Sequence, residues 1–445
     1  MSYPDRQTDP APVSGPCGSL RRNATSFRRG NPTMKNRVSI LAMLLPFALI
    51  GCETKPSDCS DLESTFVTSG LPLAVLGSTT GDGDGTFTSF SRSGTVGPDS
   101  VFEIASMTKA VTATAVMQLV EAGKIDLDAP VSEYLPELDE IGILQEDLSQ
   151  REATVPVTMR HLLTHTAGFG YFFNSDRIKR DMGIDPAGAG WPSPETIPDD
   201  EYDWGFDGLQ PRRIFEAGER WHYGRNLGIA GRVVERVSGQ DLDTYFKQHI
   251  FVPLRMTRTG YNLPGDVRAD LVQMVNRDPV TGLLIPLPSM RPVPMERFYG
   301  GGGLLSTPHD YLRFLTCLVR GGELDGTRIL SESSVDTFFT NQLVDGMSIE
   351  YDPDDPMRRG PDDAERCFLD DNDRYSFAWA IESNPDERGS RSQGTGYWAG
   401  IFNTYYSVDR NRGIAVVAFF QLLPFNDARA YELYRRYEDC IFDQP

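Results

Sequence analysis

Residues 102–124 read FEIASMTKAVTATAVMQLVEAGK, and this stretch carries both a structural and a chemical signal. From Ser106 to Glu121 nearly every side chain is apolar or small, and Gly123 follows as a helix stop. A helix that is apolar on all its faces belongs in the interior of a protein. We therefore predict a buried helix from Ser106 to Glu121.

The first turn of this helix contains the only S-x-x-K motif of the chain, formed by Ser106 and Lys109. A spacing of three residues puts both side chains on one helix face. A serine hydroxyl is a poor nucleophile until a base takes its proton, and an amine in a dry site has the lowered pKa that this task needs. The alternative is a purely structural role, in which Ser106 caps the helix and Lys109 reaches toward solvent. The residues by themselves leave both interpretations open.

Signatures of other hydrolases, of metal sites and of phosphate loops are missing from the sequence. No serine lies in G-x-S-x-G, and the pair His161 and His165 is not part of H-E-x-x-H. The run Gly300–Gly303 is not followed by the Lys-Ser/Thr of a phosphate loop. We expect no metal and no organic cofactor, and we interpret the two histidines as hydrogen-bonded structural residues at a turn.

Strand-like segments gather at the two ends of the chain, and helical patterns lie between them. We expect helices at 61–69, 232–237, 241–249, 310–320 and 426–441, and strands at 71–78, 86–92, 376–382, 402–408 and 414–422. The pattern predicts an α/β (α+β) sheet region built from 61–104 and 375–445, with an inserted, mainly helical region at 105–374. Within that insertion, 352–373 is an Asp-rich solvated loop that lacks the central Gly of an EF-hand.

The chain has 445 residues and a formal net charge of −20, from 63 acidic and 43 basic side chains. Such an acidic chain is a poor partner for nucleic acid, whose phosphates need a basic patch, and for anionic lipid. Its 39% hydrophobic and 10% aromatic residues exclude a disordered chain. Residues 1–51 are net basic, which separates them from the acidic remainder.

The amino-terminal region reads as an export signal. Residues 34–52 join a short basic segment to an apolar run of signal-peptide length, and the run ends in LIGC, which resembles the bacterial lipobox. We expect a signal peptide at 34–51, acylation of Cys52, and a tether at 52–60. We interpret Met34 as the true start of the protein and the polar residues 1–33 as an extension that is not part of it. The predicted location is the cell envelope or periplasm, with membrane attachment through Cys52.

Export implies an oxidising compartment, where disulfides persist. Cys59 and Cys440 stand near the two ends of the expected mature domain, which makes them a candidate disulfide. Cys317 lies in an apolar helical run and is expected to be a buried free thiol.

The segment 102–109 resembles the nucleophile segment of the serine β-lactamase-related family, which includes class C β-lactamases, DD-peptidases and family VIII carboxylesterases. Further blocks agree in the family's order, at 124–136, 157–168, 218–241, 250–260, 300–314 and 322–331. The resemblance covers about 71–424. It implies a β-lactamase/transpeptidase-like fold, in which helices flank an antiparallel sheet and a mainly helical region is inserted.

The resemblance also implies roles for individual residues. Ser106 matches the acylated nucleophile, Lys109 its amine partner, and Tyr223 the tyrosine that moves protons. Lactamases of the family have Asn two residues after this Tyr, whereas this chain has Arg225 there and Asn226 one place later. Both are candidate substrate-binding residues.

The third family motif, Lys-Thr-Gly in lactamases, is matched here by Trp398, Ala399 and Gly400, which are expected to line the substrate site. The esterase branch of the family has Trp-Gly-Gly. A Trp offers an apolar wall and cannot pair with a carboxylate as Lys does. The family's oxyanion hole implies the backbone N–H groups of Ser106 and Ile401.

We therefore expect an exported serine hydrolase with an acyl-enzyme mechanism, a carboxylesterase acting on a small ester or amide as a monomer. The alternatives within the family are a β-lactamase, a DD-peptidase or a D-aminopeptidase. A different class is a penicillin- or peptidoglycan-binding lipoprotein without turnover. The aromatic loop 169–210 is either a substrate lid or surface packing.

Overall fold

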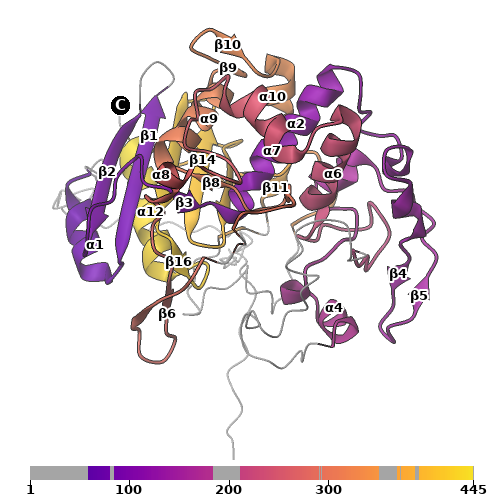
Figure 1. Ribbon diagram of the computed structural model, residues 1–445, viewed down its shortest axis with the longest axis horizontal. Helices are drawn as coiled ribbons and strands as arrows, with labels where there is room; N and C mark the ends of the chain where they lie inside the picture. The colour runs from indigo at the N-terminus through magenta and orange to yellow at the C-terminus, as the bar shows by residue number, and fades with distance from the viewer. Residues whose placement is uncertain are drawn as a thin grey trace, which may run out of the picture. The chain divides into compact units, whose positions relative to one another are not determined.

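The computed structural model describes residues 59–80, 85–183, 211–289, 291, 293–349, 368–370, 372–385 and 390–443 (Figure 1). The expected extension, signal peptide and acylation site Cys52 lie outside the described residues. So do most of the Asp-rich loop 352–373 and the part of the loop 169–210 that follows residue 183. Within the described ranges, no helix combines the length and the apolar character needed to cross a membrane.

An antiparallel sheet of seven strands joins the two ends of the described chain. Its order is β11-β12-β13-β14-β15-β1-β2. The strands are β1 (Leu73–Thr80), β2 (Thr86–Ser91), β11 (Arg374–Tyr375), β12 (Ala380–Ile381), β13 (Gly396–Gly400), β14 (Thr404–Asp409) and β15 (Ile414–Phe419). The amino-terminal hairpin β1–β2 is added to the carboxy-terminal strands where Val75 pairs with Phe419. The predicted fold class is confirmed.

Helices cover both faces of this sheet. On β14, Tyr405 stacks on Tyr434 of α12 (Ala428–Phe442) with ring centroids 4.9 Å apart. The next residue, Tyr406, meets Tyr311 of α9 (Pro308–Val319) at 5.4 Å. Because successive strand residues point to opposite faces, α12 and α9 lie on opposite sides of the sheet. Helix α1 (Leu62–Ser69) packs against α12.

The remaining elements are helices, short turns and small strands, most of them between residues 105 and 374. The helices are α2 (Thr108–Glu121), α3 (Met159–Leu163), α4 (Asp176–Asp181), α6 (Asn226–Ser238), α7 (Leu242–Phe246), α8 (Gly265–Arg268) and α10 (Glu332–Phe338). Shorter turns are η1 (Cys59–Asp61), η2 (Ala105–Met107), η3 (Val131–Glu133), η4 (Pro136–Glu140), η5 (Phe172–Asn174) and the π-turn η6 (Lys247–Phe251). The small strands are β3 (Phe102–Glu103), β4 (Ile143–Leu144), β5 (Gln150–Arg151), β6 (Val275–Arg277), β7 (Leu284–Pro286), β8 (Leu305–Ser306), β9 (Glu323–Leu324), β10 (Thr327–Arg328) and β16 (Leu422–Leu423).

Two of the expected strands are wrong in detail. The segment 376–382 is not one strand: it contains the turn between β11 and β12, where Ala378 takes a left-handed φ of 67°. The segment 414–422 ends as a strand at Phe419, because Gln421 has a φ of 52° and redirects the chain into β16. Hydrophobic pattern alone cannot reveal such backbone reversals, since neither residue is Gly.

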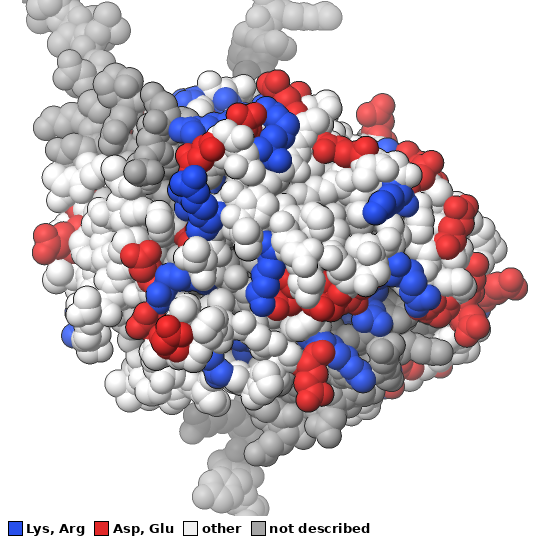
Figure 2. All heavy atoms as spheres, turned by 45° about the horizontal axis from the view of Figure 1, so that its top comes forward, with Lys and Arg blue, Asp and Glu red and all other residues white. Residues whose placement is uncertain are grey.

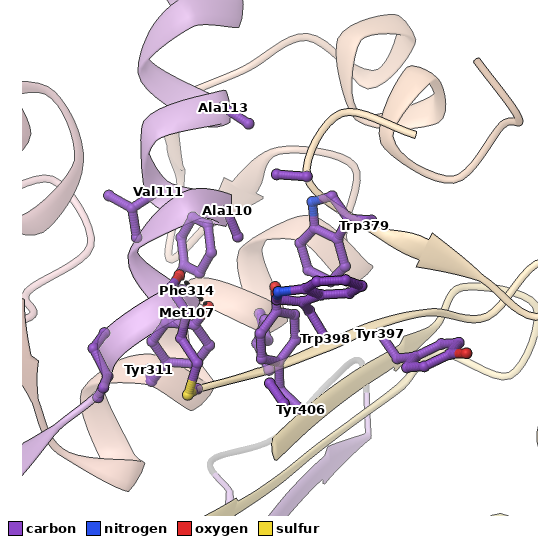
Figure 3. Close-up of a cluster of buried hydrophobic side chains, with 14 of the residues drawn as sticks. Met107, Ala110, Val111, Ala113, Tyr311, Phe314, Trp379, Tyr397, Trp398 and Tyr406 are labelled. Atoms are coloured by element: carbon purple, nitrogen blue, oxygen red, sulfur yellow. Dashed lines mark hydrogen bonds between the residues drawn. The ribbon is translucent and has the colours of Figure 1, made fainter. Parts of the chain in front are cut away.

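The predicted buried helix is confirmed as α2, which η2 precedes. Figure 3 shows its residues Met107 and Ala110 in one apolar cluster with Tyr311, Trp398 and Tyr406. The Tyr311 hydroxyl donates to the carbonyl of Met107 at 3.0 Å. The start of α2 is therefore fixed between the sheet and α9.

Acidic and basic side chains lie interspersed on the face shown in Figure 2. Exposed ion pairs of the protein include Arg160–Asp128 and Arg328–Glu323. Such exposed ion pairs contribute little to holding the fold together.

The candidate disulfide Cys59–Cys440 is present, with Cα atoms 5.4 Å apart, and it ties the start of the described chain to α12. Cys317 is a buried free thiol, as predicted. Burial raises the pKa of the Cys317 thiol to about 12, which keeps it protonated and unreactive.

We predict that Cys59→Ser lowers the free energy of unfolding by about 2–5 kcal/mol, because the bond closes a very long loop. Urea unfolding with and without a thiol reductant measures this. Reductant should lower the midpoint of the wild type and leave that of the variant unchanged. A wild-type midpoint that does not respond to full reduction would contradict the prediction.

Candidate active site

Ser106 lies in η2, at the point where the chain enters α2. The preceding residue, Ala105, has a left-handed φ of 43°, a strained conformation for a residue with a side chain. Ile104 is held by its N–H, which donates to the carbonyl of Leu304 at 3.1 Å. This turn contacts β13 and so places Ser106 beside that strand.

Two side chains meet at the Ser106 hydroxyl, one from the next helical turn and one from a distant part of the sequence. The Tyr223 hydroxyl donates to Ser106 Oγ at 2.8 Å, and Lys109 Nζ donates to the same oxygen at 3.0 Å. Lys109 is fully buried, and burial lowers the pKa of its ammonium group well below the ordinary value. The arrangement offers a hydroxyl nucleophile with a candidate base and a second proton donor in hydrogen-bond contact.

The glycine run 300–303 supports Lys109 through its backbone. Lys109 Nζ donates to the carbonyl of Gly301 at 2.6 Å, and Thr112 Oγ1 donates to the carbonyl of Gly300 at 2.7 Å. A Cβ on Gly300 would lie 2.4 Å from the carbonyl oxygen of Leu227 in α6. Only glycine allows this approach. The sequence pattern of this run excludes a phosphate loop but does not predict this role, since a backbone carbonyl leaves no side-chain signal.

Tyr223 is held by its backbone and by the residue after it. Its carbonyl accepts a hydrogen bond from Asn174 Nδ2 at 2.7 Å, and the N–H of Gly224 donates to His165 Nδ1 at 3.2 Å. A Cβ on Gly224 would lie only 1.8 Å from the carbonyl oxygen of Phe169. The loop before α6 is therefore pressed against the segment that follows His165, and Tyr223 has a fixed position.

The structural interpretation of the two histidines is confirmed. His161 Nδ1 accepts from the N–H of Thr158 at 3.2 Å, and His165 occupies a left-handed turn position with φ of 56°. Burial lowers the pKa of His165 well below its ordinary value, and the charge of Lys109 lowers it further. A neutral ring leaves Nδ1 free to accept from Gly224, while its face lies 4.7 Å from the Tyr223 ring. No cluster of metal ligands occurs in the described part of the chain.

Asn226 does not have the position expected of a substrate contact. It is fully buried at the first position of α6, where its amide Nδ2 lies 2.9 Å from His165 Nδ1 and donates to the carbonyl of Phe169 at 3.2 Å. Through these contacts Asn226 stabilises the loop that carries Tyr223. Arg225 is partly buried at the N-cap of α6, and its charge acts on the phenol of Tyr171. A substrate contact of Arg225 stays a prediction.

The third motif lies on β13 beside this group. Trp398 is buried, and its ring centroid lies 5.3 Å from that of Tyr223 and 5.4 Å from that of Tyr375. Its ring therefore packs against the ring of Tyr223. A Cβ on Gly400 would lie 2.4 Å from the carbonyl oxygen of Ile104, which shows how closely β13 approaches the nucleophile turn. Ala399 is buried and Ile401 partly buried. Their substrate-binding and oxyanion roles stay predictions.

Comparison with known proteins gives three kinds of match. The family model described as Beta-lactamase matches residues 74–439. Among curated relatives, the monacolin J acid methylbutanoyltransferase of Aspergillus terreus is 30% identical over 362 residues, which cover 78% of this chain and 83% of the relative. The lovastatin esterase of Penicillium rubens is 31% identical over 263 residues, 55% of this chain and 60% of the relative.

A solved structure gives the third match. The unliganded simvastatin synthase of Aspergillus terreus superposes with a TM-score of 0.71 at 25% identity, covering 86% of this chain and 97% of that one. The family match spans the sheet at both ends of the described chain as well as the segments with Ser106, Lys109 and Tyr223. The chain therefore belongs to the serine β-lactamase-related family, whose members are serine acyl-enzyme hydrolases or acyltransferases.

Proposed function

We propose that the protein is a serine carboxylesterase that works through an acyl-enzyme on Ser106. The observation that carries this proposal is the shared hydroxyl: Ser106 Oγ lies 2.8 Å from the Tyr223 hydroxyl and 3.0 Å from the buried Lys109 Nζ. A lysine with a lowered pKa serves as a base near neutral pH, which an exposed lysine does not.

In the proposed cycle, the proton of Ser106 passes to the neutral amine of Lys109 as the Ser106 oxygen attacks the ester carbonyl. The N–H groups of Ser106 and Ile401 stabilise the oxyanion, a contribution of about 3–4 kcal/mol per donor in related sites. Tyr223 then gives its hydroxyl proton to the leaving alcohol and takes the proton of Lys109 in its place. Water attacks the acyl-enzyme by the same route in reverse, which releases the acid and restores the Ser106 hydroxyl.

Two observations support an ester over a lactam or a peptide. Trp398 stands at the position where lactamases of the family have a Lys, so the β13 side of the site has no cation at this position for a substrate carboxylate. One of the matched relatives is named an esterase, and another transfers a methylbutanoyl group.

A substrate panel tests the proposal. Short-chain p-nitrophenyl esters should turn over faster than nitrocefin or a D-Ala-D-Ala peptide. Ser106→Ala should lower kcat/KM for the esters by about 10⁴-fold or more, and the matched control Ser89→Ala, at an exposed position of β2, should have no effect. Faster turnover of nitrocefin or the peptide would favour the alternatives, and a stable adduct without release would favour a binding lipoprotein. Full esterase activity of Ser106→Ala would refute the mechanism.

Acyl transfer to an alcohol is a second candidate, favoured by the match to the methylbutanoyltransferase over 78% of this chain. Transfer and hydrolysis share the acyl-enzyme and differ only in the nucleophile that attacks it. Adding a series of alcohols during ester turnover separates them. If transfer dominates, the ester of the added alcohol will form at the expense of free acid, and hydrolysis predicts free acid throughout.

We also propose that the protein is exported and anchored through an acylated Cys52. The lipobox-like LIGC supports this, and so does the disulfide Cys59–Cys440, since disulfides persist in oxidising compartments. Mass spectrometry of the mature protein should find a diacylated Cys52 at its amino terminus. Any other mature amino terminus would refute the anchor.

For Tyr223→Phe we predict a fall in kcat of about 10²–10⁴-fold on the best ester, because the change removes only the hydroxyl that contacts Ser106. The ring stays available to pack on Trp398, so the thermal midpoint should change little. Tyr245→Phe in α7 is the control, since its hydroxyl contacts neither Ser106 nor Lys109. A loss of less than tenfold in Tyr223→Phe would contradict the proposed proton path.

A further inference from the structure

The amine end of Lys109 lies against two adjacent aromatic rings, whose centroids are 5.5 Å apart. Its Nζ is 4.8 Å from the ring centroid of Tyr223 and 5.7 Å from that of Tyr171. A cation within about 6 Å of a ring centroid is attracted to the electron-rich face of the ring. Tyr223 already has a role in the proposed reaction, whereas Tyr171 has none so far.

Tyr171 is fixed in this position by its neighbours. Its N–H donates to Asn174 Oδ1 at 3.0 Å, its ring stacks on Phe173 with centroids 4.7 Å apart, and its hydroxyl lies 3.3 Å from that of Tyr299. Asn174 also donates to the carbonyl of Tyr223. One residue therefore positions both rings that face Lys109.

The ring of Tyr171 acts as a neutral phenol. Burial raises its pKa well above the ordinary value, and the neighbouring Tyr299 and Tyr223 raise it further. Its influence on Lys109 is therefore that of a ring face, and no phenolate charge is involved.

Few other groups stabilise a proton on Lys109. Its hydrogen-bond acceptors are Ser106 Oγ and the Gly301 carbonyl, and no carboxylate of the described residues forms an ion pair with it. The titratable and charged groups around it are the hydroxyl of Tyr223, the neutral His165, and Tyr171 with its neighbours Arg225 and Tyr299. The two rings therefore add to these two hydrogen bonds in stabilising the ammonium form.

We propose that Tyr171 is a positioning residue for the Lys109 ammonium: its ring lies beside that of Tyr223 and adds a second aromatic face that stabilises the proton on Lys109 between its removal from Ser106 and its delivery toward the leaving group. This inference rests on the proposed function. The sign of its effect follows from the charge balance, because removing the ring makes the ammonium less stable and leaves Lys109 neutral down to a lower pH.

The rate at which a fluorophosphonate labels Ser106 tests this as a function of pH, without any substrate. In that step the Ser106 oxygen bonds to phosphorus, fluoride leaves, and the Ser106 proton passes to Lys109. The labelling rate should rise with pH as Lys109 loses its proton. In Tyr171→Leu this rise should move to lower pH by about 0.4–1.5 units.

Tyr171→Phe is the matched control, because it keeps the ring and loses only the hydroxyl next to Tyr299. Its pH profile should coincide with that of the wild type. An unshifted profile in Tyr171→Leu, or an equal shift in both variants, would overturn the inference while labelling of Ser106 leaves the proposed function intact. Absence of labelling in the wild type would refute both. If thermal unfolding shows Tyr171→Leu to be unfolded, Tyr171→Met takes its place with the same criteria.

Discussion

Lys109→Met should lower kcat/KM for the best ester by about 10³-fold or more and leave the protein folded. Met has nearly the shape of the Lys stem and fits the apolar surroundings of α2, but it cannot accept the proton of Ser106. The variant removes a buried amine whose protonation is costly, and it gives up the hydrogen bond to Gly301. Removing the buried amine stabilises the fold, whereas losing the hydrogen bond to Gly301 destabilises it. The free energy of unfolding should therefore change by no more than about 1–2 kcal/mol.

The pH dependence gives this prediction a second readout. In the wild type, kcat/KM should rise with pH through the lowered pKa of Lys109, because only the neutral amine is a base. That rise should be absent in Lys109→Met. The control Lys124→Met changes an exposed lysine just beyond the same helix and should leave both rate and profile unchanged. Activity within tenfold of the wild type in Lys109→Met would exclude Lys109 as the base.

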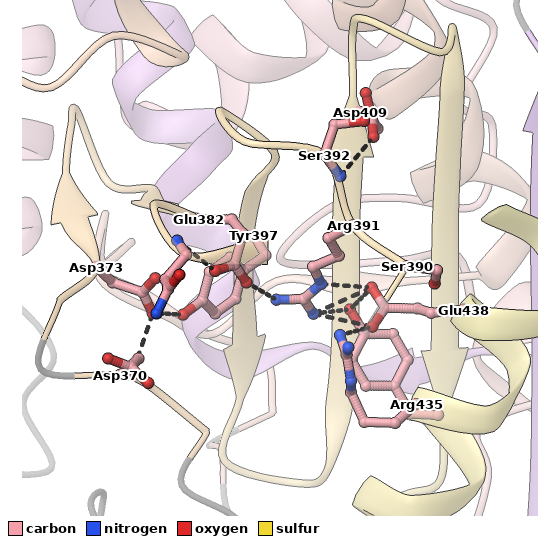
Figure 4. Close-up of polar contacts among 12 residues, drawn as sticks. Asp370, Asp373, Glu382, Ser390, Arg391, Ser392, Tyr397, Asp409, Arg435 and Glu438 are labelled. Carbon is pink, nitrogen blue, oxygen red and sulfur yellow. Dashed lines mark hydrogen bonds and ion pairs between the residues drawn. The ribbon is translucent and has the colours of Figure 1, made fainter. Parts of the chain in front are cut away.

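Arg391→Met should lower the free energy of unfolding by about 3–5 kcal/mol, the usual result of leaving a buried charge without its partner. Arg391 is buried behind β13 (Figure 4), where its Nη2 donates to Glu438 Oε1 at 3.0 Å and its Nη1 lies 3.8 Å from Glu382 Oε2. Its guanidinium carbon also lies 4.2 Å from the ring of Tyr397 on β13. Removing it would leave two buried carboxylates poorly compensated.

The sign of the pH dependence follows from Glu438. Burial by itself would raise its pKa, but Arg391, together with Arg435, lowers it below the ordinary 4.5. Its stabilising interaction is therefore present above about pH 4.5 and is lost as the pH falls through the lowered value. Without Arg391 the same carboxyl accepts a proton at higher pH, so the deficit of Arg391→Met should be smaller at pH 5 than at pH 8.

Urea unfolding at the two pH values measures both effects. Arg436→Met, on α12 like Glu438, is the control, because Arg436 pairs with Asp61 at the surface and is 45% exposed. Exposed pairs contribute less than about 1 kcal/mol. Equal destabilisation by the two substitutions would show that burial of the Arg391 network has no special importance.

The sequence predicts the nucleophile because its signal is local. Ser106 and Lys109 stand three residues apart on one helix, so their contact follows from helix geometry. Tyr223 lies 117 residues from Ser106 along the chain, and only the family resemblance places it in the site. The same holds for β13, because the residues around Trp398 lack the hydrophobic alternation that predicts a strand.

What the sequence misses is carried by backbone groups and by reversals of the chain. The carbonyl of Gly301 has no side-chain signature, although the glycine run marks a close approach. Asn226 was expected at the substrate because it stands one place from the family's Asn. That one-residue shift moves it to the first turn of α6, where its amide supports His165.

The most direct test of the account is intact-mass analysis of protein quenched during turnover of a short-chain ester, followed by peptide mapping. The account predicts a mass increase equal to the acyl group, located on Ser106. It predicts no such increase in Ser106→Ala. An adduct on another residue, or ester turnover at the wild-type rate in Ser106→Ala, would contradict the claim that Ser106 carries the acyl group.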